Sequence, residues 1–184
     1  DAVLNYSYHL KEIIHQKLAE SSTLNQSLDR TFPQRLIENH KNEIIIQKDE
    51  LLQRLTAVEE KRKFLIGVGL YDPEKEPVPN PEIGDEHIQS VLSVYVQDQE
   101  EKLSIYNELA GRIDLLENLI NSRFLYKQMR IDKETGFAFE TEQGPLSPTK
   151  LSSGEQHELI LIYELLFLTK KETLVFIDEP ELSF

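Results

Sequence analysis

The stretch LSSGEQHELILIYELLFLTKKETLVFIDEP, residues 151–180, places a polar turn, an apolar helix and an apolar run ending in two carboxylates in succession. Ser152 and Ser153 can cap the free amides of a first helical turn, and Gly154 lets the backbone approach a ligand closely. Residues 158–167 are apolar on almost every side, which predicts a helix packed inside an α/β layer. The start of such a helix favours anions.

The apolar run at residues 174–177 predicts a strand buried on both faces. Asp178 and Glu179 follow it directly, at the carboxyl end, where open α/β sheets place their ligands. One helix and one connection separate Gly154 from Asp178, as a parallel α/β unit requires. Taken alone, the polar turn could be an ordinary capped helix start, and the strand with its acidic end is only moderately specific. Together they indicate a phosphate site.

LSSGEQ followed by LVFIDEP resembles the signature and Walker B motifs of ABC-type ATPases, in the branch of the Rad50, SMC, RecF and RecN proteins. The resemblance implies an α/β fold, namely that of an ABC-ATPase head, and it implies that the protein uses ATP and Mg²⁺. It also implies a homodimer in which the signature of one subunit meets ATP held by the other. In this arrangement Ser152, Ser153, Gly154 and Glu155 would bind ATP in trans. Ser153 and Glu155 differ from the commonest form of the signature motif, LSGGQ, and such variants are familiar in this branch.

The resemblance gives the two carboxylates separate roles. Asp178 would hold the magnesium ion, usually through water, and Glu179 would orient or deprotonate the attacking water. General chemistry agrees, because phosphoryl transfer needs placement and charge stabilisation more than covalent catalysis. We therefore expect ATP hydrolysis with Glu179 as the catalytic residue and Asp178 as the metal ligand.

The seven glycines build no G-x-x-x-x-G-K-[ST] pattern, so the chain carries no P-loop. It also ends directly after the Asp-Glu-Pro, before the histidine switch that the family carries on a following strand. We expect an internal or C-terminal piece of a longer ATPase, inactive by itself, with a P-loop lobe before it and further strands after it. The alternative is a split or degenerate protein.

The composition sets further bounds. The 184 residues, 39% hydrophobic and 29% charged, are enough for a folded domain and an extended element. No apolar run approaches the length of a membrane span and no leader is visible, so we expect a cytoplasmic protein without a membrane partner. The absence of cysteine excludes disulfides and thiolate metal sites. The net charge of -13 argues against nucleic-acid binding by this acidic piece alone.

We expect residues 1–33 to be a helical lead-in of the head. Helical spacing of apolar residues predicts a helix over residues 1–20, and the Ser-, Thr- and Asn-rich residues 21–33 predict a loop. Pro33 suits the first position of a new helix.

Residues 34–124 predict a helical arm. Apolar side chains recur every seven residues at Ile37, Ile44, Leu51, Val58 and Leu65. Because the intermediate positions are mostly polar, an antiparallel hairpin (a short intramolecular coiled coil) is favoured over a free-standing dimeric coil. Prolines and glycines crowd residues 66–85, which predicts the hairpin tip, and the second helix is expected over residues 86–124. We interpret His87, near the tip, as a solvated residue rather than a ligand.

Residues 125–184 complete the expected head. Alternation around Met129 and Ile131, and the shared face of Phe137 and Phe139, predict a β-hairpin with its turn at residues 132–136. Residues 143–150 are expected to be a linker. The sequence from the predicted β-hairpin through the signature motif resembles that of ATPases of bacterial anti-phage systems, of the Septu and retron-associated kinds.

Two functions are therefore weighed. In the first, ATP-driven dimerisation of the heads gates a partner activity, such as a nuclease acting on nucleic acid in DNA repair or anti-phage defence. In the second, the chain is a structural or interaction protein whose helical hairpin binds a partner while the head is degenerate. A P-loop lysine upstream of this chain would favour the first function.

Overall fold

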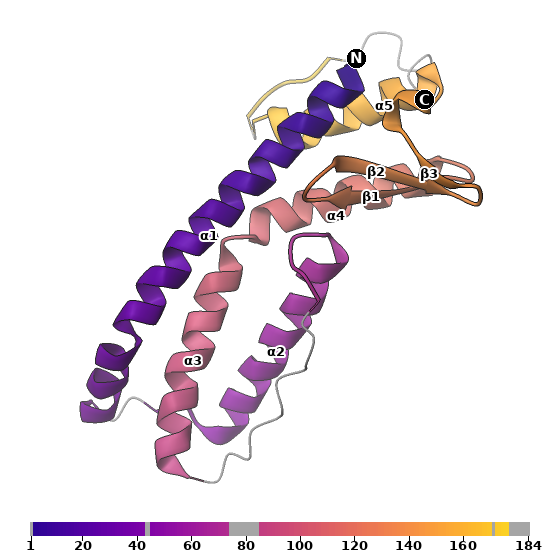
Figure 1. The fold of residues 1–184 in the computed structure, drawn as a ribbon. Helices are drawn as coiled ribbons and strands as arrows, with labels where there is room; N and C mark the ends of the chain where they lie inside the picture. Colours follow the sequence, from indigo (N-terminus) through magenta and orange to yellow (C-terminus); the bar gives the residue numbers. More distant parts are fainter. Residues whose placement is uncertain (1, 43–44, 74–84, 171, 177–184) are drawn as a thin grey trace. The chain divides into compact units, whose positions relative to one another are not determined.

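The computed structural model describes residues 2–42, 45–73, 85–170 and 172–176 (Figure 1). These residues form a mostly helical protein with one small antiparallel sheet. The elements in chain order are α1 (Ala2–Lys41), α2 (Lys48–Gly67), α3 (Glu86–Ser104), α4 (Asn107–Arg123), β1 (Gln128–Asp132), β2 (Gly136–Thr141), β3 (Gly144–Leu146), a 3-10 turn (Pro148–Lys150), α5 (Ser153–Tyr163) and a π-helical turn (Glu164–Leu168).

The chain divides into two compact units, which are described separately. The head unit comprises residues 1–15, 68–70 and 108–184, and the helical unit comprises residues 16–67 and 71–107. Within the described residues no helix is long and apolar enough to cross a membrane.

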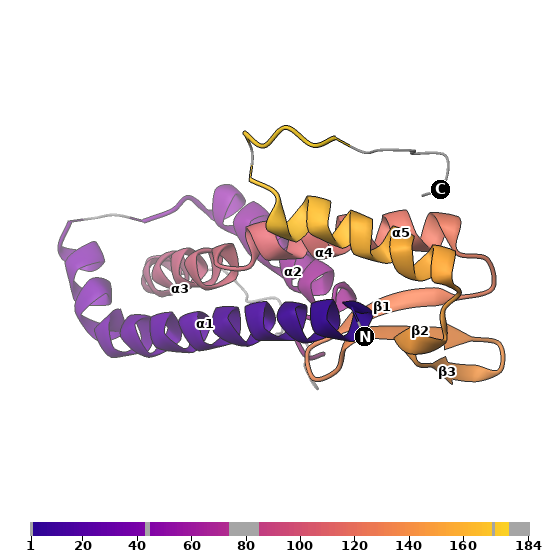
Figure 2. The same ribbon diagram turned by 90° about the horizontal axis from the view of Figure 1, so that it is seen from above.

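The sheet of the head unit has the strand order β1-β2-β3. Met129 pairs with Phe139 and Ile131 pairs with Phe137, so that the apolar side chains of both strands share one face and are buried there. This confirms the β-hairpin predicted from the alternating pattern. α4, α5 and the first turns of α1 gather beside the sheet (Figure 2). β3 lies within residues 143–150, for which the sequence predicts a linker because Gly144 and Pro145 are unusual within strands.

Side chains of α4 cover the free edge of β1. The Met129 amide donates to Asn121 Oδ1 (2.6 Å), and Asn121 Nδ2 donates to the Met129 carbonyl (3.0 Å). Two residues further on, the Ile131 amide donates to Glu117 Oε1 (2.6 Å). An uncovered strand edge would present unpaired backbone groups, so these contacts complete the sheet without a fourth strand.

The turn between β1 and β2 is held by α1. Ser7 Oγ donates to the Thr135 carbonyl (3.0 Å) and accepts from the Phe137 amide (2.8 Å). Gly136 adopts φ +79, and a Cβ there would lie 2.4 Å from Ser7 Oγ. Only glycine fits this approach, because other side chains meet both strain and overlap.

The strand predicted at residues 174–177 is wrong for the residues that the structure describes. Leu174, Val175 and Phe176 form no strand and are 77%, 42% and 86% exposed. A buried parallel strand needs a neighbour to pair its amides and carbonyls. The described strands form an antiparallel meander whose free edge on β1 is already covered by α4. The apolar sequence alone is therefore not sufficient to make a strand here.

The loop predicted at residues 21–33 is also wrong, since α1 continues through it and contains Pro33 internally. Leu28 is buried on the inner side of α1 together with Ser21, whereas Ser22, Thr23, Gln26 and Ser27 are exposed, so most of the polar composition belongs to the solvent-facing side. Arg35 helps to hold the turn around Pro33, because Nη2 donates to the Leu28 carbonyl (2.8 Å) and to Asp98 of α3 (2.8 Å). Tertiary contacts here outweigh the helix-breaking tendency of proline.

The seven-residue seam is confirmed in part. Leu51, Val58 and Leu65 of α2 are buried, whereas Ile37 of α1 is 55% exposed. Ile44 lies outside the described residues. α1 ends at Lys41 and α2 begins at Lys48, so the single helix expected over these positions is two helices. The second expected helix is likewise divided, because α3 ends at Ser104 and α4 begins at Asn107.

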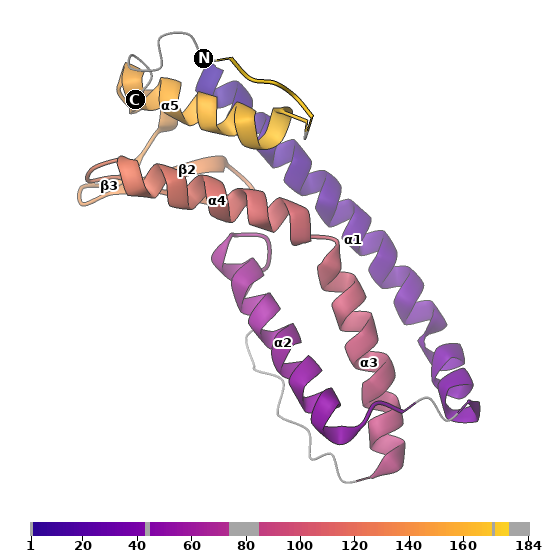
Figure 3. The same cartoon turned by 180° about the vertical axis from the view of Figure 1, so that it is seen from behind.

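The antiparallel hairpin is corrected to a parallel pair. Ile46, just before α2, donates its amide to Ser93 Oγ (2.9 Å), and Arg54 Nε donates to Glu100 Oε1 (2.8 Å). Contacts advance along both helices in the same direction, and α2 and α3 lie side by side (Figure 3).

The antiparallel neighbour of α3 is the C-terminal part of α1. Arg35 pairs with Asp98, and Asp29 pairs with Lys102 (2.8 Å), so the residue numbers run in opposite directions. The predicted tip also begins differently, because Val68 and Leu70 are buried. Gly69, at φ +74, lies so close to β1 that a Cβ would be 2.3 Å from the Ile131 carbonyl oxygen.

Candidate functional site

The candidate site is the start of α5, where the LSSGEQ stretch lies. Ser152 is the N-cap residue, and its Oγ accepts from the Glu155 amide (3.3 Å). Glu155 reaches back, because its Oε2 accepts from the Ser152 amide (2.8 Å). These reciprocal bonds form a capping box, which satisfies two amides that the first helical turn leaves without partners. The predicted cap is confirmed and fixes where the helix begins.

A lysine next to the sheet also contacts the capping box. Lys127, one residue before β1, forms an ion pair with Glu155 Oε1. Burial raises the pKa of Glu155, but the hydrogen bonds from Lys127 and from Ser152 outweigh it, and the resulting pKa lies below the ordinary value of 4.5. Glu155 is therefore ionised in the folded protein at neutral pH and is directed at its own helix start.

The residues directly before α5 are held in place by burial and by hydrogen bonds. Leu151 is buried, and Gln156 Nε2 donates to the carbonyls of Leu151 (2.9 Å) and Thr149 (3.2 Å). Gln156 is the last residue of the LSSGEQ stretch, and this contact was not foreseen. It holds the backbone directly before Ser152 in place, so the cap is preorganised.

The outer side of the first turn is open. Ser152, Ser153 and Gly154 are all exposed. A Cβ added at Gly154 would meet nothing within 4 Å among the described residues. Glycine in a helix lowers stability by about 1 kcal/mol relative to alanine, so packing within the described residues does not explain its presence here. The amides of Ser153 and Gly154 are the first two of the helix and have no acceptor one turn earlier within it.

The far end of α5 is anchored in the core of the head unit. Tyr163 is fully buried, stacks on Phe167 at 4.6 Å between ring centroids and meets Phe137 edge-on at 5.5 Å. Its hydroxyl lies 2.7 Å from His9 Nδ1 of α1. Burial raises the pKa of Tyr163, so the hydroxyl stays protonated. The exposed start of α5 therefore belongs to a helix whose other end is held by packing in the core.

The structure brings four of the predicted site residues together. Ser152, Ser153, Gly154 and Glu155 form the cap and first turn of α5. Asp178 and Glu179 lie outside the described residues, so their placement relative to this turn stays a prediction. Within the ranges that the structure describes, no three His, Asp or Glu side chains gather as a metal site.

The sequence contained a signal for the capping box that the prediction did not use. Ser152 and Glu155 have the S-x-x-E spacing of a capping box directly before an apolar run. The contribution of Lys127 carried no such signal, because it depends on how the sheet packs against the helix. Compared with known proteins, the chain matches no protein-family model, no curated protein and no solved structure.

Proposed function

We propose that this chain is the signature-bearing part of an ABC-type ATPase whose two heads enclose ATP. In this proposal Ser152, Ser153 and Gly154 contact the γ-phosphate of ATP held by a second copy. Asp178 holds the magnesium ion and Glu179 orients the attacking water. The P-loop that holds the nucleotide is supplied outside this stretch of sequence.

One observation supports the proposal most directly: α5 begins with an exposed, preorganised turn whose first two amides point out of the helix end. Such a turn carries a partial positive charge and suits a phosphate group. The open space beside Gly154 lets a phosphate approach the backbone closely. These features fit an anion presented from outside the chain better than one held within it.

The role of Glu155 in the proposal is indirect. Its carboxylate would repel a phosphate, but it is held by Lys127 and by the Ser152 amide on the inner side of the turn. It therefore keeps the Ser152 backbone and the helix start in position, and leaves the amides of Ser153 and Gly154 for the ligand. ATP and Mg²⁺ supply the reacting phosphoryl group and its charge neutralisation, and this chain supplies orientation.

The wider context of the proposal is a cytoplasmic ATPase that gates a partner, such as a nuclease, in DNA repair or defence. The net charge of -13 favours a protein partner over direct nucleic-acid contact by this part. The competing function, an interaction protein with a degenerate head, predicts that no nucleotide-dependent dimer forms.

The test uses the longer protein that carries this chain together with a P-loop. Glu179→Gln keeps the shape of the side chain and removes the water-orienting carboxylate, so hydrolysis should fall by roughly 10²- to 10⁴-fold while ATP binding persists. Light scattering should then detect an ATP-dependent dimer. Adding Ser152→Arg should abolish that dimer by blocking the helix start.

Two matched controls separate blockage from lost stability. Ser152→Ala removes the cap at a cost of about 1 kcal/mol, together with one proposed phosphate contact, but leaves the turn open, so the dimer should weaken without being abolished. Ser122→Arg adds the same side chain at another exposed serine of the head unit and should also leave the dimer intact. If Glu179→Gln hydrolyses ATP at the parent rate, or if Ser152→Arg still dimerises, the proposal fails.

A further inference from the structure

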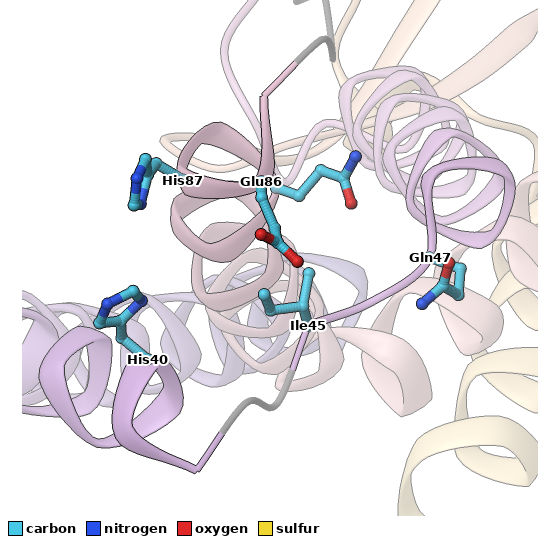
Figure 4. Close-up of a pocket in the computed structure, with 6 residues that line it drawn as sticks. His40, Ile45, Gln47, Glu86 and His87 are labelled. Carbon is cyan, nitrogen blue, oxygen red and sulfur yellow. The ribbon is translucent and has the colours of Figure 1, made fainter.

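Two histidines from different helices lie together in the helical unit (Figure 4). His40 is in the last turn of α1 and His87 is in the first turn of α3. Their ring centroids are 5.8 Å apart and the ring planes are inclined at 43°. Both side chains are exposed and line a hollow of ≈ 520 Å³. We propose that His40 and His87 bind a divalent transition-metal ion between them.

The spacing of the rings fits a shared metal ion. Imidazole nitrogens bind zinc at about 2.0–2.1 Å, which places the centroids of two rings on one metal about 4.5–5.5 Å apart for bond angles of about 90–120°. The observed 5.8 Å is slightly longer than this range, so the rings need to approach each other by only a few tenths of an ångström to share an ion. Small side-chain rotations would aim a nitrogen of each ring at a common point, because neither ring is enclosed by packing.

The ring nitrogens are available for a ligand. Among the described residues neither the His40 ring nor the His87 ring hydrogen-bonds to a protein group. By contrast, His9 Nδ1 lies 2.7 Å from the Tyr163 hydroxyl, and His15 Nε2 lies 3.1 Å from the Lys133 carbonyl oxygen. The two facing histidines are therefore distinguished from these two by both position and unused nitrogens.

The surroundings favour a cation of the zinc, nickel or copper kind. Glu86 also lines the hollow and adds negative charge, and the C-terminal end of α1 favours positive charge near His40. Imidazole ligands suit zinc, copper and nickel, whereas magnesium and calcium prefer oxygen. Two protein ligands leave the remaining positions of the ion to water. A bound ion would tie the end of α1 to the start of α3.

The experiment titrates the 184-residue chain with Zn²⁺ by calorimetry, in excess Mg²⁺ so that oxygen-ligand sites are occupied. We expect one Zn²⁺ per chain. His40→Ala and His87→Ala should each weaken binding at least about 10-fold, and the double variant should be little weaker than either single variant, because each removes the shared chelate. Cu²⁺ should bind more tightly than Zn²⁺ or Ni²⁺, following the usual order of affinity.

His15→Ala and His157→Ala are the matched controls, since both histidines are exposed and lie outside the pair. They should leave the affinity unchanged. The proposal is overturned if either control weakens binding as much as the His40 and His87 variants do, or if those two variants bind Zn²⁺ as the parent does. One Zn²⁺ per two chains would also overturn it, by assigning the ion to a contact between copies. Because ATP is absent, the outcome is independent of the proposed ATPase function.

Discussion

In the head unit the buried side chains are almost all apolar, whereas the helical unit buries charged and hydroxyl side chains between its helices. The described buried polar residues of the helical unit are Ser21, Arg62, Ser90, Ser93 and Asp98, against Ser7 in the head unit. The head unit instead packs Phe137 and Phe139 with Tyr163 and Phe124. One chain thus uses two ways of joining its elements.

The difference teaches what each kind of contact determines. Apolar burial supplies most of the favourable free energy of folding, but it does not depend on the precise orientation of the side chains in contact. Buried ion pairs return little net stability, but each one requires a particular partner. In the helical unit, Asp98 and Glu100 of α3 face α1 and α2 respectively, through Arg35 and Arg54. These pairs specify which helices are neighbours and in which direction they run.

The largest effect is expected in the apolar core of the head unit. Phe139→Ala removes a buried ring that packs on Phe124 and leaves a cavity, so the free energy of unfolding should fall by about 3–5 kcal/mol. Denaturant unfolding followed by circular dichroism measures the change. Leu125→Ala is the control, because this leucine is 74% exposed, and it should change stability by less than about 0.5 kcal/mol. Equal effects of both variants would mean that the face of Met129 and Phe139 is not the core.

The same contrast explains how much of the fold the sequence could predict. The β-hairpin was predictable because Met129, Ile131, Phe137 and Phe139 alternate with polar residues, and burial of one face follows directly. The direction of α2 was not, because it depends on pairs such as Arg54 with Glu100, which are distant in sequence. Charged residues occur on any exposed helix, so their pattern does not identify partners.

A smaller effect is expected from the buried ion pair of the helical unit. Asp98 is buried and Arg35 is partly exposed, so Asp98→Ala should lower stability by about 2 kcal/mol, less than for a fully enclosed pair. Much of this loss comes from leaving the Arg35 guanidinium without its carboxylate. The double variant Arg35→Met with Asp98→Leu should therefore recover most of the stability.

Glu108→Ala provides the exposed counterpart, because its pair with Arg112 is an i,i+4 contact on the surface of α4. It should change stability by less than about 0.5 kcal/mol. Thermal unfolding of the parent, the single variants and the double variant forms the comparison. If the double variant is less stable than Asp98→Ala alone, then the pair itself stabilises the helices and the contrast between the units is weaker than stated.

The candidate site was predictable to a similar, partial extent. The polar turn and the cap at Ser152 could be predicted because capping is local, involving residues three apart. The pairing of Lys127 with Glu155 could not be predicted, because it joins the residue before β1 to α5, 28 positions further along the chain. The exposed state of Leu174, Val175 and Phe176 was missed for the same reason, since burial of an apolar run depends on which elements are near it.

The smallest effect concerns two carboxylates of the head unit whose pKa values shift in opposite directions. The pKa of Glu155 lies below its ordinary value: burial raises it, but the bonds from Lys127 and Ser152 outweigh burial. Burial raises the pKa of Glu117, and the hydrogen bond from the Ile131 amide offsets this only in part. Each carboxylate accepts a backbone amide, so replacement by glutamine can keep the hydrogen bond and remove the charge.

The signs of the two effects follow by linkage. A lowered folded pKa means that ionised Glu155 stabilises the fold at neutral pH, and that this contribution is lost as the pH falls through the folded pKa. A raised folded pKa means that the contribution of Glu117 is present below its unfolded pKa and is lost as the pH rises through the folded value. At neutral pH Glu155→Gln should therefore destabilise by about 0.5–1 kcal/mol, and Glu117→Gln should stabilise by a similar amount. Denaturant unfolding at about pH 7 and at successively lower pH tests both, because protonation removes the same charges and the difference between each variant and the parent should shrink as the pH falls. If Glu155→Gln is as stable as the parent at neutral pH, the Lys127 pair does not hold the helix start, and the preorganised turn must rest on the Ser152 cap and Gln156 alone.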